Sequence, residues 1–191
     1  LQVDQALEQG SMLVLTARLL CFDGMYRWFR ARGQAHKDAD GRLLRISGLL
    51  SDQTASREAD ERRRLASTVV ENTIEGVVVT DAYSRILSVN RSFTRLLGFS
   101  EEEMLGQTPR MFKSGRHDKA FYDAMWARMR SHGHWQGEIW NRRKSGEVFP
   151  ERMSLSAVKD ANDHVTHYVC MFTDISAEKA REQQLEFLAH R

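Results

Sequence analysis

The sequence predicts an α+β fold, an antiparallel sheet of about five strands with flanking helices on one side. Two strand-like runs, at residues 76–82 and 85–89, are followed by three helical stretches, three further strand-like runs and a last helix. Strands grouped apart from helices, without strict alternation, are typical of this class. An internal repeat at a spacing of 122 residues places the end of a second such unit in front.

The first part of the chain is expected to complete that earlier unit. Residues 1–9 have the pattern of a helix end, closed by Gly10. Three strands with tight turns between them are expected at residues 12–22, 26–37 and 43–50. Residues 54–72 contain neither glycine nor proline and predict a long helix.

Helix caps mark the middle of the second unit. Asn90 is placed to cap a helix over residues 91–97, which Gly98 ends. Ser100 and Glu103 have the spacing of a capping box, which predicts the start of another short helix.

A longer helix is expected over residues 118–131. Phe121, Met125 and Met129 recur there at intervals of four and predict its buried stripe. The remaining elements are three strands and a closing helix, expected at residues 135–143, 147–159, 164–173 and from residue 177 onward.

The repeat aligns residues 22–60 with residues 144–182 without gaps. Eight of the 39 aligned pairs are identical: Gly24/Gly146, Arg30/Arg152, Ala35/Ala157, Lys37/Lys159, Asp38/Asp160, Ala39/Ala161, Asp52/Asp174 and Ala55/Ala177. Many fall in turns or at strand ends, where the backbone restricts the residue type. The repeat therefore predicts two copies of a closing hairpin and strand, each followed by an aspartate and a helix.

Composition excludes several classes of protein. The chain is 41% apolar and 28% charged, as in ordinary soluble globular proteins. A net charge of +2 does not predict nucleic-acid binding. No run approaches the roughly 18 apolar residues of a membrane span, and the first residues lack the apolar core of a signal peptide. We expect a cytoplasmic location, or the cytoplasmic part of a membrane-anchored protein.

No group of residues predicts catalysis or metal binding. The Ser, His and Asp residues lack the context of a nucleophile elbow, and there is no glycine-rich phosphate loop. The two cysteines stand alone, and the histidines are scattered without ligand spacing. We therefore expect a regulatory chain that is not an enzyme, with no catalytic residue and no metal.

A polar pocket is the more informative hypothesis. Strand alternation places Trp135 and Asn141 on one face together with Ile139. In the next strand Glu151 shares its phase with the apolar Phe149. A buried amide or carboxyl needs hydrogen-bond partners, which the fold, water or a ligand can supply.

These motifs, in this order, resemble the PAS family. VNRSFTRLLGFSEEEMLGQ resembles its signature, the segment from SGRHDKAF to LSAVKD resembles its long helix and hairpin, and YVCMFTDIS resembles its Asp-Ile-Thr-type ending. The resemblance implies the following organisation: the truncated end of a first PAS domain at 1–54, a linker helix at 55–72, a complete PAS domain at 65–176 and an outgoing helix at 177–191.

The resemblance also implies candidate ligands. FAD-binding PAS domains of redox sensors carry a run similar to W-x-G-x-x-x-N-R-R-K, and aerotaxis sensors carry an element similar to Arg116-His117-Asp118. Pocket candidates are therefore Trp135, Asn141, Met125, Glu151, His117 and Arg116. FAD is a candidate cofactor, whereas haem is disfavoured because residues 118–130 of the long helix contain no histidine. The light-sensing flavin class is excluded, because PRMFKSGR replaces its reactive cysteine motif.

In the PAS family the aspartate before the closing helix ties that helix to the sheet. The resemblance therefore gives Asp52 and Asp174 a signal-relay role, with a simple helix cap as the alternative. The predicted function is a sensory and signal-relay module of a bacterial signalling protein, which acts on a C-terminal output domain in cis.

The sequence motifs of the chain most resemble those in PAS domains of bacterial proteins that make or break cyclic di-GMP. In these, a helix similar to LEFLAHR leads into a GGDEF domain. A small-molecule ligand and a homodimer through the linker helices are further expectations. The alternatives are an FAD-binding redox sensor and a ligand-free dimerisation or protein-interaction module.

Overall fold

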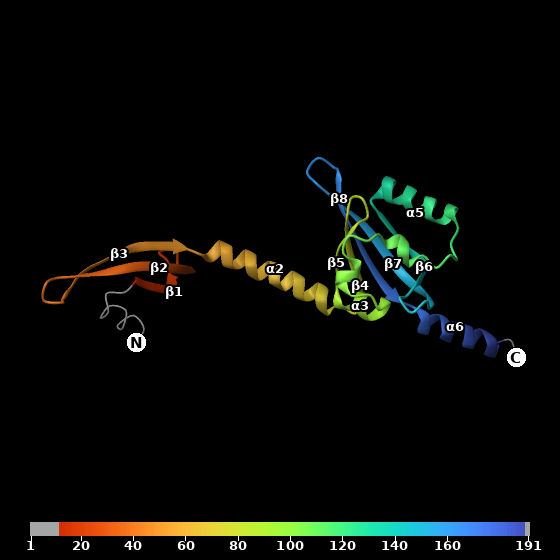
Figure 1. Ribbon diagram of the computed structural model, residues 1–191, viewed down its shortest axis with the longest axis horizontal. Coiled ribbons are helices and arrows are strands. Elements are labelled where there is room, and N and C mark those ends of the chain that lie inside the picture. Colours follow the sequence, from red (N-terminus) through yellow and green to blue (C-terminus); the bar gives the residue numbers. More distant parts are fainter. Residues whose placement is uncertain (1–11, 190–191) are drawn as a thin grey trace. The chain divides into compact units, whose positions relative to one another are not determined.

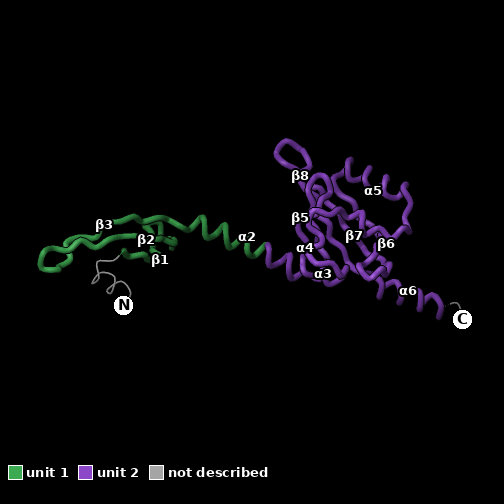
Figure 2. Tube along the Cα trace, viewed as in Figure 1, with its two compact units in different colours: residues 1–66 green, residues 67–191 purple. Residues whose placement is uncertain are grey.

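The computed structural model describes residues 12–189. The chain forms two compact units, residues 1–66 and 67–191 (Figure 2). The helix end expected at residues 1–9 lies outside the described residues. The boundary between the units falls within the long helix α2 (Thr54–Asn72), which has the bounds that the sequence predicts.

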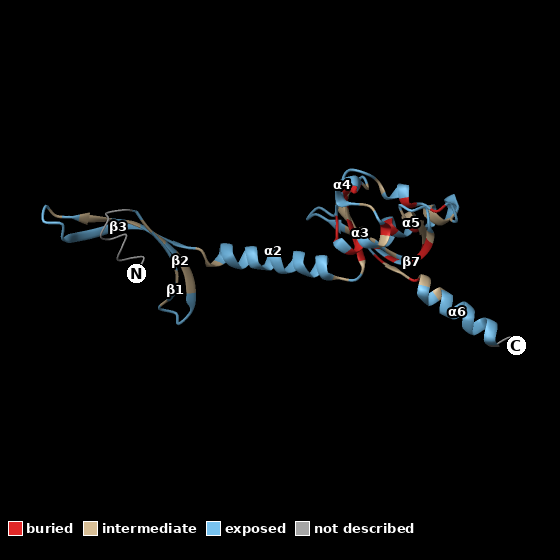
Figure 3. Ribbon diagram, turned by 60° about the horizontal axis from the view of Figure 1, so that its bottom comes forward, coloured by how far each residue is buried: buried red, intermediate tan, exposed pale blue. Residues whose placement is uncertain are grey.

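The first unit contains a three-stranded antiparallel sheet in the order β1-β2-β3 (Figure 1). Its strands are β1 (Met12–Leu20), β2 (Tyr26–Lys37) and β3 (Leu43–Asp52). The first strand ends two residues before the expected position, because Cys21 begins the hydrogen-bonded turn to Met25. None of residues 12–66 is buried (Figure 3).

The second unit is a five-stranded antiparallel sheet in the order β5-β4-β8-β7-β6. Its strands are β4 (Gly76–Asp81), β5 (Ile86–Val89), β6 (His134–Arg142), β7 (Val148–Lys159) and β8 (Val165–Asp174). Its helices are α3 (Arg91–Leu97), α4 (Glu101–Met104), η1 (Pro109–Phe112), α5 (Lys119–His132) and α6 (Ser176–Ala189). The α+β class and the five-stranded sheet are confirmed. The short 3₁₀ helix η1 was not predicted.

The hydrophobic core lies between this sheet and the helices α3 to α5 (Figure 3). Phe93 is fully buried, and its ring makes edge contacts with Phe112 and Phe172 at centroid distances of 5.6 and 6.0 Å. Gly76 lies under the same Phe172 ring, which would be 2.2 Å from any Cβ atom at that position. Met125 and Met129 of the expected α5 stripe are buried, while Phe121 is only half-buried.

Asn90 joins three elements of the second unit. Its Oδ1 accepts hydrogen bonds from the backbone N–H groups of Phe93 and Val77, each at 2.9 Å. Its Nδ2 donates to the carbonyls of Val70 and Glu75, also at 2.9 Å. The expected cap of α3 is therefore confirmed, and the same side chain holds the last turns of α2.

The sequence repeat is retained in the turn of each hairpin. Asp38 Oδ1 accepts from the N–H groups two and four residues further on, and Asp160 Oδ1 does the same. This pattern stabilises a tight turn and accounts for the aspartate in both copies.

The same repetition holds where each sheet passes into a helix. Thr54 N–H donates to Asp52 Oδ1 at 2.9 Å, and Ser176 N–H donates to Asp174 Oδ1 at 2.8 Å. The residue between the aspartate and the helix is Gln53 in the first copy and Ile175 in the second, and its N–H donates to the neighbouring strand. Each aspartate thus accepts a hydrogen bond from the first N–H of the outgoing helix, which has no partner within the helix. The aspartate lies two residues before that N–H.

Candidate functional site

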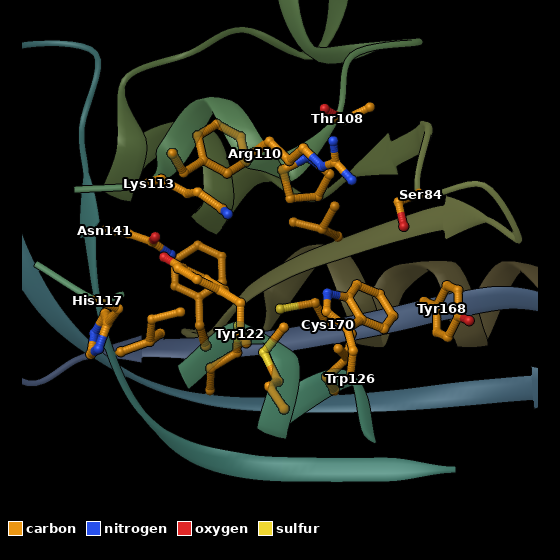
Figure 4. A pocket seen from close by; sticks show the side chains of 18 of the residues that line it. Ser84, Thr108, Arg110, Lys113, His117, Tyr122, Trp126, Asn141, Tyr168 and Cys170 are labelled. Carbon is orange, nitrogen blue, oxygen red and sulfur yellow. The ribbon is translucent and has the colours of Figure 1, made fainter. Parts of the chain in front are cut away.

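A cavity of about 740 Å³ opens in the second unit, between the sheet and the segment that contains η1 and α5. Its floor is apolar and comes from the sheet, α3 and α5; it includes Val78, Phe93, Met125, Ile139, Met153 and Phe172. Polar side chains gather at two ends: Figure 4 shows Asn141, Lys113 and the Tyr122 hydroxyl at one, and Ser84 and Tyr168 at the other.

Glu151 brings a carboxyl group into this apolar lining. It lies on β7 and is 2% exposed. Asn141 Nδ2 donates to Glu151 Oε1 at 2.7 Å, whereas Glu151 Oε2 has no partner among the residues that the structure describes. Burial raises the pKa of Glu151 to about 8, against the smaller lowering effect of the Asn141 hydrogen bond. The neutral acid is therefore the main form at neutral pH.

Tyr122 supplies the second buried polar atom of the cavity. Within residues 12–189 its hydroxyl has no hydrogen-bond partner. Lys113 Nζ lies 3.7 Å from the centre of its ring, a cation–π contact. Burial raises the pKa of Tyr122, and the nearby Glu151 adds to this. Tyr122 is three and seven residues before Met125 and Met129, so helical spacing alone could have indicated it.

His117 fastens the start of α5 to the sheet. Its Nε2 accepts the Trp140 backbone N–H at 2.8 Å, and its ring stacks on Phe121 at 3.9 Å. Burial lowers the pKa of His117, and the hydrogen bond requires a lone pair on Nε2. The side chain is therefore a neutral histidine at the cavity edge.

Two family comparisons cover most of the chain. The family described as PAS domain matches residues 74–177, and the family described as PAS fold matches residues 1–50. The chain belongs to the PAS domain family. It contains a PAS sensor domain of the kind found in signalling proteins.

PAS relatives occur in regulators of different kinds. The nitrogen fixation regulatory protein of Klebsiella oxytoca is 30% identical over 118 residues, which are 62% of this chain and 24% of that protein. A blue-light-activated histidine kinase of Brucella canis is 28% identical over 120 residues, 61% of this chain and 24% of that protein. The chain thus spans about a quarter of the length of these relatives.

Solved structures share the fold. The PAS domain of a Colwellia psychrerythraea protein superposes with a TM-score of 0.57 at 20% identity, over 61% of this chain and 98% of that one. An RNA-binding light-oxygen-voltage receptor superposes with a TM-score of 0.59 at 16% identity, over 100% of this chain and 85% of that one. At these identities the likeness concerns the PAS fold alone.

The PAS cavity brings together four of the six pocket candidates: Met125, His117, Asn141 and Glu151. Trp135 and Arg116 lie outside its described lining, which differs from the expectation. The ring of Trp135 lies over Gly137, within 2.6 Å of where a Cβ would be, because glycine leaves that surface open. The guanidinium of Arg116 lies 3.8 Å from the ring of Trp140, a residue on the other face of β6.

The relay candidate Asp174 is held from the side by Arg143. The Arg143 guanidinium donates to Asp174 Oδ2 and to the Leu96 carbonyl at the end of α3. It also pairs with Glu147 at 3.0 Å and lies 3.8 Å from the Phe149 ring. Burial opposes ionisation of Asp174, but the hydrogen bonds from Ser176 and Arg143 outweigh it and hold its pKa below the usual range. The sequence placed Arg143 only in the W-x-G-x-x-x-N-R-R-K run and gave no sign of its contact with Asp174.

The other relay candidate has a different setting. At the position of Arg143, the first repeat has Cys21. Asp52 is exposed, and hydrogen bonds from Thr54 lower its pKa. Asp52 and Asp174 therefore each accept a hydrogen bond from the helix that follows. Among the described hydrogen bonds, the one from an arginine is made to Asp174.

Two ion pairs fasten the first turn of α6 to the outer side of the sheet. Arg152 pairs with Glu178, and Lys179 pairs with Glu138, both at 2.8 Å. These side chains are about half exposed, so each pair contributes little stability by itself.

Within residues 12–189, no three His, Cys, Asp or Glu side chains come together in a way that could hold a metal ion. None of the helices there is long and apolar enough to cross a membrane.

Proposed function

We propose that the chain is a sensory and signal-relay region, in which the PAS cavity binds a small molecule and Asp174 passes its effect to α6. The observation that carries this proposal is the cross-strand pairing of Glu151 with Asp174. One of these carboxyl groups lines the cavity, and the other holds the outgoing helix.

The cavity has the character of a binding site. It is mostly apolar, with polar groups gathered at its two ends, and small-molecule sites generally combine an apolar lining with a few polar groups. Glu151 and Tyr122 each contribute a buried polar atom without a described partner. Buried polar atoms left unpaired are costly, so a ligand that pairs them gains affinity and specificity.

The step from cavity to helix is electrostatic. Both Asp174 and Arg143 influence the ionisation of Glu151. A ligand that alters the charge or hydrogen bonding of Glu151 therefore alters the strength of the ion pair between Arg143 and Asp174. Because Asp174 also accepts from Ser176, this change reaches the first turn of α6.

The same logic suggests a direction for the whole chain. Residues 1–54 would be the end of a first PAS domain, and the helix after Asp52 would carry its input along residues 55–72. The domain at 65–176 would add its own input, and the helix at 177–191 would pass both to an output domain in cis. We further propose a homodimer through the linker helices.

The nature of the output is a separate proposal. The closing helix, with its LEFLAHR sequence, supports a domain for cyclic di-GMP synthesis or breakdown. The names of the Klebsiella and Brucella relatives support an output in nitrogen fixation regulation or a histidine kinase output instead. Transferring residues 1–191 onto each kind of output domain and measuring ligand-dependent activity distinguishes these alternatives.

A flavin-bound redox sensor is the second candidate function. It is favoured by the position of Asn141 at the polar end of a cavity large enough for a ring system. The residues present fit such a ring, because apolar side chains line the floor and Asn141 and Tyr122 offer polar contacts. Asn141, Glu151 and Tyr122 would orient it, and the flavin itself would supply the redox chemistry.

One experiment tests both candidates. The chain is purified without denaturation, its absorption spectrum is recorded, and the small molecules released on unfolding are identified by mass spectrometry. Flavin bands would support the redox sensor, and a colourless released molecule would support another ligand. If nothing is released and no metabolite raises the melting temperature, the sensing proposal is wrong and a protein-interaction role is left.

A further inference from the structure

Two buried polar atoms in the PAS cavity have no described partner, and together they indicate what the cavity selects. We propose that Glu151 acts as a neutral carboxylic acid which, with the Tyr122 hydroxyl, donates hydrogen bonds to an uncharged ring ligand bearing carbonyl or ring-nitrogen acceptors. This inference rests on the proposed function, because it requires that the cavity binds a small molecule.

The geometry at Glu151 determines where its proton lies. Oε1 already accepts the Asn141 amide at 2.7 Å, so it acts as the carbonyl oxygen. Oε2 is the atom without a described partner, and a proton there gives an O–H donor. The Tyr122 hydroxyl is a second donor in the same lining. An acceptor-bearing ligand satisfies both groups.

The surroundings favour the neutral form of Glu151. The groups that influence it are Asn141 on β6, Asp174 on β8 and Arg143 after β6. Glu151 in turn helps to raise the pKa of Tyr122 on α5 and of Cys170 on β8. Burial and the charge of Asp174 act against ionisation, whereas Asn141 and Arg143 act for it, and burial dominates. The charge of Arg143 is already shared with Asp174 and Glu147.

The apolar floor of the cavity favours a ring without charge. The floor is aromatic, aliphatic and sulfur-containing, as in Phe93, Met125 and Met153. A cationic ligand would meet the Lys113 ammonium group, which lies against the Tyr122 ring. An anionic group deep in the cavity would lose its hydration beside a carboxyl.

The described residues of the first unit lack the two polar groups of this site. At a spacing of 122 residues, the equivalents of Asn141 and Glu151 in the first repeat are Leu19 and Phe29. The two apolar replacements remove both hydrogen-bonding groups together, as expected if they act as one site.

The protonation state is tested first in the ligand-free chain. Infrared spectroscopy near neutral pH should show the carbonyl band of a buried neutral carboxylic acid in the parent chain and not in the E151Q variant. The band should disappear as the pH rises above about 8. The E102Q variant, which changes an exposed glutamate of α4, should keep it. A spectrum without this band in the parent chain would overturn the inference without touching the proposed function.

Ligand preference is tested next by titrating riboflavin, an uncharged tricyclic probe with ring carbonyls, into the full chain. We expect its affinity to be constant below the pKa of Glu151 and to fall about tenfold per pH unit above it. E151Q, whose amide N–H can still donate, should bind with little dependence on pH. E151L should lose about tenfold or more in affinity at neutral pH, because the donor is gone.

Two results of the titration would contradict the inference. Affinity that rises with pH would mean that the ionised carboxylate binds the ligand. A parent chain that binds not riboflavin but a co-purified molecule that is charged or lacks ring acceptors would refute the stated ligand class. If no small molecule of any kind binds the parent chain, the proposed function fails as well.

Discussion

Glu151 and Asp174 are directly paired across β7 and β8, yet they are in opposite states of ionisation at neutral pH. Burial raises the pKa of Glu151 to about 8, while hydrogen bonds from Ser176 and Arg143 hold the pKa of Asp174 below its usual range. A neutral acid in the cavity thus adjoins an ionised one at the start of α6. Any change at the first alters the electrostatic environment of the second.

Arg143 is expected to stabilise the junction between the PAS sheet and α6. We expect R143A to lower the free energy of unfolding by about 2 kcal/mol, because it removes charge-assisted hydrogen bonds to Asp174 and to the end of α3. Urea unfolding of the second unit measures this. R128A changes an exposed arginine of α5 and should cost less than about 0.5 kcal/mol. Equal effects of the two variants would remove Arg143 from the junction.

The pH dependence of stability should report Glu151. Its pKa is about 8 in the folded chain and near 4.5 when exposed, so the folded state binds the extra proton between these values. Its contribution to stability is complete below pH 4.5 and is lost progressively as the pH rises through about 8.

The E151Q variant removes this titration and tests the sign directly. Relative to the parent chain, its stability should improve as the pH rises from about 5 to 8, by an amount set by the folded and unfolded pKa values. Thermal unfolding at several pH values measures the difference. A difference that is constant with pH would show that Glu151 titrates normally in the folded chain.

Asn90 is expected to be the most costly polar residue to replace in the second unit. Its four hydrogen bonds connect α2, β4 and α3, and N90A leaves several buried backbone groups unpaired. We expect a loss of about 3 kcal/mol in urea unfolding. N162A, in an exposed hairpin turn, is the matched control and should cost less than about 1 kcal/mol. A small effect of N90A would mean that water replaces its bonds.

The two relay aspartates should differ in strength. D52N removes an exposed helix contact and should perturb the start of α2 only slightly. D174N also weakens the bond to Arg143 and should perturb its helix more. Hydrogen exchange of the first turns of α2 and α6 compares them. If both variants loosen their helices equally, Arg143 adds nothing to the junction.

Sequence patterns predicted the fold well because the fold depends on local signals. The capping residues Asn90 and Ser100, and the alternation of β7, appear in the structure as expected. The repeat recurs in the hydrogen bonds of both hairpin turns and both helix junctions.

The site was less predictable, because its contacts join residues far apart in the chain. Arg143 reaches Asp174 over 31 positions, and nothing near Arg143 in the sequence indicates this. The Trp135 ring lies where a side chain of residue 137 would be, which is possible because that residue is glycine. Helical spacing admits both Phe121 and Tyr122, and both pack against the core, but only Tyr122 is among the described residues that line the cavity.

The most direct test of the relay is amide hydrogen exchange along α6, in parent and D174N chains, with and without a bound cavity ligand. Riboflavin serves as the ligand if no other molecule co-purifies. The relay predicts that ligand changes exchange in the first turns of α6 several-fold in the parent chain. In D174N this response should vanish while ligand affinity is retained. An unchanged α6 in the parent chain, or the same response in D174N, would contradict a relay through Asp174.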